Sequence, residues 1–143
     1  MKMFIRGQLP YSDDTFLKSY RERILQLAKL VPKLVIVAPF PESPQWGPNT
    51  GRVYLQDKQD SIPKIEQYLD LQKKVLNILD EVSKLSNVNV IYPHRYLSNG
   101  KGELLSLAHL DTEKETIPLY YDDDHLNEFG SKLIVEEIFN CIE

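Results

Sequence analysis

Hydrophobic residues recur along the chain in two different patterns, and these predict alternating helices and strands. Apolar residues follow one another at steps of three and four over 16–31 and again over 65–85. This spacing is typical of an amphipathic helix that buries one stripe. Ser12 or Asp13 is suited to cap the first helix, and Pro32 ends it.

An unbroken apolar run, rich in β-branched residues, covers 34–38 between these helices, and Pro39 ends it. A strand with one solvated face would alternate, so this run predicts a strand buried on both faces, as in a parallel sheet. Residues 88–92, Val-Asn-Val-Ile-Tyr, predict another strand, which Pro93 ends. A shorter apolar run at 3–5 predicts one more strand before the first helix.

The remaining segments complete an α/β pattern. Residues 42–59, with several prolines and glycines, and the polar residues 96–116 are predicted to be irregular. A last helix is expected from about Asn127, with one apolar side made of Phe129, Leu133, Ile134, Ile138 and Ile142. Alternating strands and helices predict parallel strands joined by helical crossovers. The predicted fold is therefore a three-layer α/β/α sandwich with a short, flavodoxin-like parallel sheet.

Composition narrows the class of protein. The chain has 143 residues, of which 42% are hydrophobic and 27% charged, as expected for a single soluble domain spanning 1–143. Its net charge of −4 argues against a nucleic-acid partner. Cys141 is the one cysteine, so an internal disulfide and a cysteine zinc cage are excluded. No apolar run approaches the ~20 residues of a membrane helix, and the start does not read as a signal peptide.

The segment before the last predicted helix contains the candidate catalytic residues. Asp122, Asp123 and Asp124 stand directly before His125. A histidine that acts as a base needs a carboxylate to hold its ring, and an Asp three residues earlier can fold back through a turn to reach it. Asp122 has that spacing. The alternative is an acidic loop that caps the helix, with His125 an ordinary surface residue.

A metal site is the weaker alternative for the same segment. Asp122, Asp124 and His125 could be joined by a distant His94 or His109. The acidic run does not fit an EF-hand, because leucines stand where oxygen ligands are required. His94 follows a strand end, the side of a parallel sheet where ligands bind, but a loop histidine bonded to backbone explains it better. No metal and no cofactor is predicted.

Residues 119–130 read Leu-Tyr-Tyr-Asp-Asp-Asp-His-Leu-Asn-Glu-Phe-Gly. This segment resembles the C-terminal block of the SGNH/GDSL hydrolases, in particular the SGNH domains fused to bacterial membrane acyltransferases that O-acetylate surface polysaccharides. Asn127 stands where that block usually has Ser, an exchange between two good helix caps. The resemblance implies an esterase or O-acyltransferase with a glycan or acyl-ester substrate. It makes His125 the general base and Asp122 its partner in a Ser-His-Asp triad.

Weaker likeness extends upstream. Residues 35–42 resemble the family's strand that ends in a Pro-x-Pro turn, and residues 4–6 resemble the strand before it. That strand often ends in Arg-Trp, so Arg6 is a candidate substrate-binding residue, although Gly7 replaces the Trp. Trp46 could line a sugar or acyl pocket, or it could cover the edge of the sheet.

The nucleophile that the family requires is missing. No serine follows Gly-Asp, and Ser61, which follows Gln-Asp, is better explained as a helix cap. The resemblance implies that the first strands are absent and that the chain is the C-terminal two thirds of a domain, inactive by itself. The strand at 3–6 would then be an exposed edge, open to self-association. The alternative function is a non-catalytic remnant that binds a partner or a glycan.

The same resemblance implies a location. It makes the chain the extracytoplasmic domain, periplasmic or at the cell surface, of a membrane-bound acyltransferase. Contact with the membrane would come only through a fused region that these residues do not include.

Overall fold

The computed structural model describes residues 13–41, 64–104, 107–109, 116–121 and 125–142. Within them, helices and strands alternate because the apolar positions switch between the helical period and short continuous runs. The elements are, in chain order, α1 (Asp13–Leu30), β1 (Leu34–Val37), α3 (Ile65–Val82), β2 (Val88–Ile91), the 3-10 helix η2 (Pro93–Arg95), β3 (Leu107–His109), β4 (Thr116–Pro118) and α4 (Glu128–Ile142).

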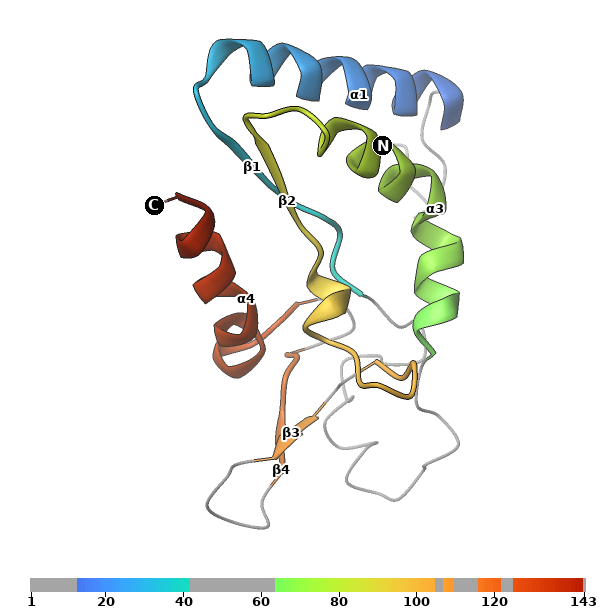
Figure 1. Cartoon of the computed structure of the whole chain (residues 1–143). Helices are drawn as coiled ribbons and strands as arrows, with labels where there is room; N and C mark the ends of the chain where they lie inside the picture. The colour runs from blue at the N-terminus through green and yellow to red at the C-terminus, as the bar shows by residue number, and fades with distance from the viewer. Residues whose placement is uncertain (1–12, 42–63, 105–106, 110–115, 122–124, 143) are drawn as a thin grey trace, which may run out of the picture.

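Strands β1 and β2 form a parallel pair. Leu34 lies opposite Val88, and Val37 lies opposite Ile91. Helix α3 lies between the two strands in the chain and makes the crossover that parallel strands need (Figure 1). This arrangement confirms the predicted α/β class. The strand expected at 3–5 lies outside the described residues.

Helices cover both sides of this strand pair. Helices α1 and α3 lie on one side, and α4 lies on the other (Figure 1). Their buried side chains form one cluster with the strands, to which α1 contributes Ile24 and Ala28, α3 contributes Leu79, and α4 contributes Ile134. The layers expected of an α/β/α sandwich are therefore present, with the sheet reduced to two strands among the described residues.

Strand β1 is less buried than its sequence suggests. Its first three residues are half-buried, and Val37 is 36% exposed, although an unbroken apolar run predicts burial on both faces. Among the described residues β1 pairs only with β2, so one edge of β1 has no described neighbour. The prediction of full burial is wrong for β1. In β2, Val88 and Ile91 are both buried.

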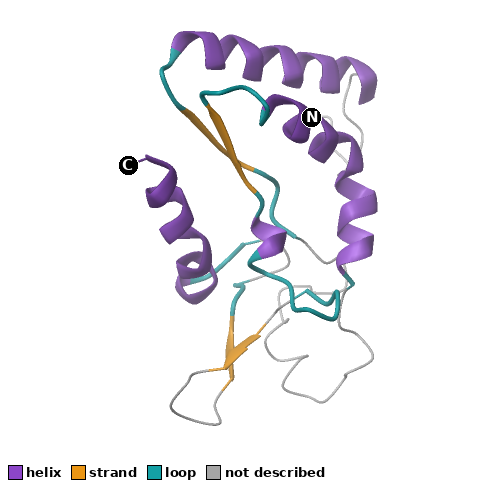
Figure 2. Cartoon of the chain, in the orientation of Figure 1, coloured by secondary structure: helices purple, strands orange, loops and turns teal. Residues whose placement is uncertain are grey.

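The segment 96–116, predicted to be irregular, contains one strand of a small hairpin and the first residue of the other. Strands β3 and β4 run antiparallel, with Leu107 opposite Pro118. Figure 2 shows the two strands of this hairpin apart from β1 and β2. Each strand has three residues, which is too few for a period to be recognised.

The apolar stripes of the helices are narrower than the spacing predicts. In α4, Leu133 is 40% and Ile142 59% exposed, whereas Ile134 is 2% exposed. In α1, Phe16 and Leu27 are 44% and 50% exposed. The periodicity places the helices correctly but selects too many residues for the core.

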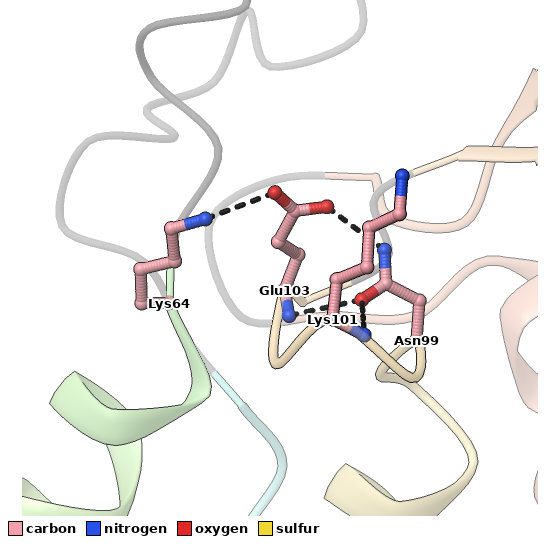
Figure 3. A network of polar contacts seen from close by, with 4 residues as sticks. All are labelled: Lys64, Asn99, Lys101 and Glu103. Carbon is pink, nitrogen blue, oxygen red and sulfur yellow. Dashed lines mark hydrogen bonds and ion pairs between the residues drawn. The ribbon is translucent and has the colours of Figure 1, made fainter.

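A polar turn fixes the start of α3 (Figure 3). The Asn99 side-chain oxygen accepts hydrogen bonds from the backbone N–H groups of Lys101 and Glu103, at 2.9 and 3.1 Å. The Glu103 carboxylate accepts from Asn99 Nδ2 and pairs with Lys64 Nζ, both at 2.9 Å. Gly102 adopts a φ of 72°, which suits glycine, and its carbonyl accepts from the first N–H of α3 at 3.0 Å.

Candidate functional site

Of the four residues assigned to the site from sequence, the structure describes His125. Asp122, Trp46 and Arg6 lie outside the described residues, as does Ser61. His125 is exposed and stands three residues before the start of α4. The pairing of Asp122 with His125 therefore stays a prediction.

Paired backbone holds His125 in place. The Tyr121 N–H donates to the His125 carbonyl at 2.8 Å, and the Asn127 N–H donates to the Leu119 carbonyl at 3.0 Å. Tyr120 and Leu126 form an antiparallel bridge between these two bonds. His125 thus lies in the second of two short paired segments, 119–121 and 125–127, and the second segment leads directly into α4.

Asn127 joins the second of these segments to the helix. Its side-chain oxygen accepts hydrogen bonds from the backbone N–H groups of Phe129 and Gly130, both at 3.0 Å. These are two of the N–H groups that the first turn of a helix leaves unpaired, so Asn127 is the N-cap of α4. The cap is 8% exposed, and it explains why Asn can replace Ser in this motif.

His125 lines a pocket of about 350 Å³. Among the described residues, the side chains that line it are those of Phe40, His125, Leu126, Ser131, Ile134, Val135 and Ile138. Phe40 stands just beyond the carboxyl end of β1, and the last four residues form one face of α4. Ligands of open α/β sheets bind at the carboxyl ends of the strands, so the pocket occupies the expected position.

Tyr68 of α3 fixes the turn that carries Phe40. Its hydroxyl donates to the Pro39 carbonyl at 2.6 Å, and the side chain is 2% exposed. Burial raises the pKa of Tyr68 to about 12, so the hydroxyl keeps its proton at neutral pH. Burial, with a smaller contribution from Tyr68, also raises the pKa of Tyr120.

A second cluster lies after β2. The His94 ring packs on Tyr68 and Tyr92, with ring centroids 5.3 and 5.8 Å apart. Tyr92 donates to the Asp80 carboxylate, and its pKa is raised to about 12, first by burial and then by that bond. Arg95 stacks over Tyr92 at 4.3 Å from the ring centroid.

His94 is half-buried, and one of its ring nitrogens is shielded from solvent. Its Nδ1 is buried and has no hydrogen-bond partner among the described residues, so the backbone bond considered for it from sequence is not found at that nitrogen. Burial lowers the pKa of His94, the charge of Arg95 lowers it further, and Asp80 opposes both effects. His94 is therefore held in its neutral form.

The described part of the chain holds no group of three His, Cys, Asp or Glu side chains that could bind a metal ion. Of the described residues that line the pocket, His125 and Ser131 have polar side chains. Such a set suits proton transfer and hydrogen bonding at one end of an apolar pocket.

The fold and the pocket define an α/β domain with a histidine at the carboxyl edge of its sheet. Residues 3–139 match the family model of the SGNH domain (fused to AT3 domains). The chain therefore belongs to this family, and it is a domain of the esterase and acyltransferase type. No curated protein and no solved structure matches it. In the described residues, no helix is both long enough and apolar enough to cross a membrane.

The sequence pattern does not indicate several of the pocket residues. Phe40 stands in the turn that ends a predicted strand, and Ser131 belongs to no motif. Val135 lies outside the predicted apolar side of the last helix, although it follows Ser131 by four residues and precedes Ile138 by three. That spacing was the available signal for one helix face.

Proposed function

We propose that the chain takes part in acyl transfer to a carbohydrate hydroxyl, with His125 as the general base and Asp122 as the carboxylate that orients it. The observation that carries this proposal is the position of His125 at the pocket beside Phe40. Family membership supports the type of reaction. The serine nucleophile would come from sequence outside these residues, since none of the 143 residues forms Gly-Asp-Ser.

The reaction follows the Ser-His-Asp scheme. The serine oxygen attacks the carbonyl carbon of the acyl donor while His125 takes the hydroxyl proton. The tetrahedral intermediate collapses, the bond to the leaving group breaks, and His125 returns the proton to that group. A sugar hydroxyl then attacks the acyl-serine, again with His125 taking and returning one proton. Asp122 stabilises the imidazolium formed in each half.

The acceptor and the location are part of the proposal. SGNH domains fused to AT3 domains are the family of this chain, which supports an acceptor at the cell surface and an extracytoplasmic position. The acceptor is a surface polysaccharide, and Trp46 and Arg6 are the residues we assign to binding it. Membrane attachment would be supplied by the fused region, and these 143 residues would form the later two thirds of the catalytic domain.

The isolated chain is expected to be inactive. Loss of the serine alone costs about a million-fold in a serine protease. Purified chain and its His125→Ala variant should therefore both hydrolyse p-nitrophenyl acetate at the buffer rate. A rate well above buffer that His125→Ala abolishes would contradict the absence of a nucleophile. Ser61→Ala and Ser131→Ala would then show which hydroxyl reacts.

The function itself is tested in the source cell. His125→Ala and Asp122→Asn, introduced at the chromosomal locus, should remove the O-acyl signals from the NMR spectrum of the purified surface polysaccharide. Asp124→Asn removes one negative charge, as Asp122→Asn does, at the residue next to His125. This control variant should leave those signals unchanged. Normal acylation with His125→Ala at an unchanged protein level would overturn the proposal.

One observation favours a second candidate, a non-catalytic module that binds a glycan or a partner. The chain contains the histidine block of the family but no Gly-Asp-Ser. Such a module would retain its role in the cell after His125→Ala. The reading frame upstream of Met1 separates the two candidates, because an in-frame Gly-Asp-Ser there supports catalysis.

A further inference from the structure

One face of α4 lines the pocket at His125 over more than two helical turns. Its polar side chains, His125 and Ser131, lie near the start of the helix, and Ile138 lies seven residues beyond Ser131. Seven residues of α-helix span about 10 Å. Along α4, the described lining of the pocket therefore extends beyond its polar side chains by more than the length of an acetyl group.

The other described residues that line the pocket are apolar. Ile134, Val135 and Ile138 form the side made by α4, and Phe40 contributes an aromatic side chain from beyond β1. Ile134 is 2% exposed and belongs to the core, whereas Val135 is 40% exposed and is free to contact a ligand. The volume, about 350 Å³, lies within the range of small-molecule sites.

We propose that this pocket binds the alkyl chain of the acyl group, and that the acyl group is longer than acetyl, on the order of four to eight carbons. This inference rests on the proposed function, because it needs the reacting carbonyl near His125. A ligand with one polar, reactive end and one apolar tail matches the distribution of side chains along the pocket. An acetyl group would leave the contacts at Val135 and Ile138 unused.

The test measures binding rather than turnover, so it needs no nucleophile. N-methylalkanamides are neutral, stable mimics of acyl esters. They are titrated from two to eight carbons into the ¹⁵N-labelled chain, and the amide signals of Ser131, Val135 and Ile138 are followed by NMR. The Kd is expected to fall about fourfold for each added CH2 until the pocket is filled, and then to level off. N-methylacetamide should cause no shift.

Two variants of α4 provide the control. Val135→Asp places a charge in the pocket and should raise the Kd of N-methylhexanamide at least tenfold. Leu133→Asp introduces the same charge on the same helix at equal exposure, 40%, outside the pocket lining, and should leave the Kd unchanged. If Val135→Asp fails to fold, Val135→Thr keeps the shape and should raise the Kd several-fold.

Other outcomes would overturn the inference. A Kd that does not depend on chain length, or an equal effect of the two Asp variants, would exclude an alkyl-binding pocket. Shifts of the same amides with protein concentration alone, together with dimer formation in sedimentation, would make the pocket an interface between two copies.

A variant at His125 separates this inference from the proposed function. His125→Ala tests the proposed function through acylation in the cell, whereas the dependence of Kd on chain length in the unmodified chain tests the alkyl pocket. Loss of acylation without chain-length-dependent binding would overturn the alkyl pocket alone.

Discussion

Gly130 lies directly against the backbone of Leu119. A β-carbon at position 130 would be 2.3 Å from the Leu119 carbonyl oxygen, which is closer than real side chains approach. The same carbonyl accepts the hydrogen bond of the Asn127 N–H. The absence of a side chain at Gly130 therefore allows α4 to begin against the paired segments 119–121 and 125–127.

Gly130→Ala is accordingly expected to destabilise the fold by about 1 to 3 kcal/mol, although Ala is the better helix former. The clash involves backbone, which cannot rotate away. The free energy of unfolding in urea measures the effect. Gly100→Ala is the matched control, since nothing lies within 4 Å of its β-carbon and the change should stay within about 0.5 kcal/mol. Equal values for the two variants would contradict the close approach.

Asn127→Ala removes the cap of α4 and should cost about 1 kcal/mol, which lowers Tm by roughly 3 to 4 °C. Two N–H groups of the first turn lose their acceptor in a buried position. Asn127→Ser keeps an acceptor and should restore most of the Tm. Thermal unfolding followed by circular dichroism distinguishes them, and a Tm for Asn127→Ser as low as that of Asn127→Ala would show that capping is not the cause.

Most of the α/β frame could be predicted because it depends on local signals. Pro32 directly follows Val31, the last residue of the predicted first helix, and α1 ends at Leu30. The apolar run at 34–38 predicted β1. The preference of Asn and Ser for the same helix position predicted that Asn127 caps α4. These features need only the neighbouring residues and their hydrogen-bonding capacity.

The pocket could not be predicted in the same way. Phe40 and His125 are far apart in the chain, and they meet because Tyr68 fixes the turn after β1 and paired backbone fixes the loop before α4. Leu133 and Ile134 are adjacent and equally apolar. Packing against the other elements, rather than periodicity, decides that Ile134 is buried and Leu133 exposed.

The turn at the start of α3 contains an ion pair, whose contribution to stability should depend on salt, and side-chain-to-backbone hydrogen bonds, whose contribution should not. Glu103→Gln removes an exposed ion pair with Lys64, so its small destabilisation should shrink in 1 M NaCl. Asn99→Ala removes the acceptor of two backbone N–H groups and should cost about 1 to 2 kcal/mol at either salt concentration. Urea unfolding at 0.05 and 1 M NaCl compares them. A strong salt effect on Asn99→Ala would contradict this division.

His94 should make stability depend on pH just below neutrality. Burial lowers its pKa in the folded protein below the ordinary value of 6.5. As pH falls through about 6.5, the unfolded chain takes up a proton that the folded protein does not, so the free energy of unfolding falls. This loss continues until the lowered folded pKa is reached. Glu81 and Glu103, whose pKa values lie below the ordinary 4.5, lose their contribution only at lower pH.

Urea midpoints between pH 5 and pH 8 measure this dependence. His94→Leu removes the titrating ring and the buried Nδ1, and should flatten the profile between pH 5 and 6.5. A stability that rises on acidification in this window, or a slope that persists in His94→Leu, would show that His94 is not held neutral by its surroundings.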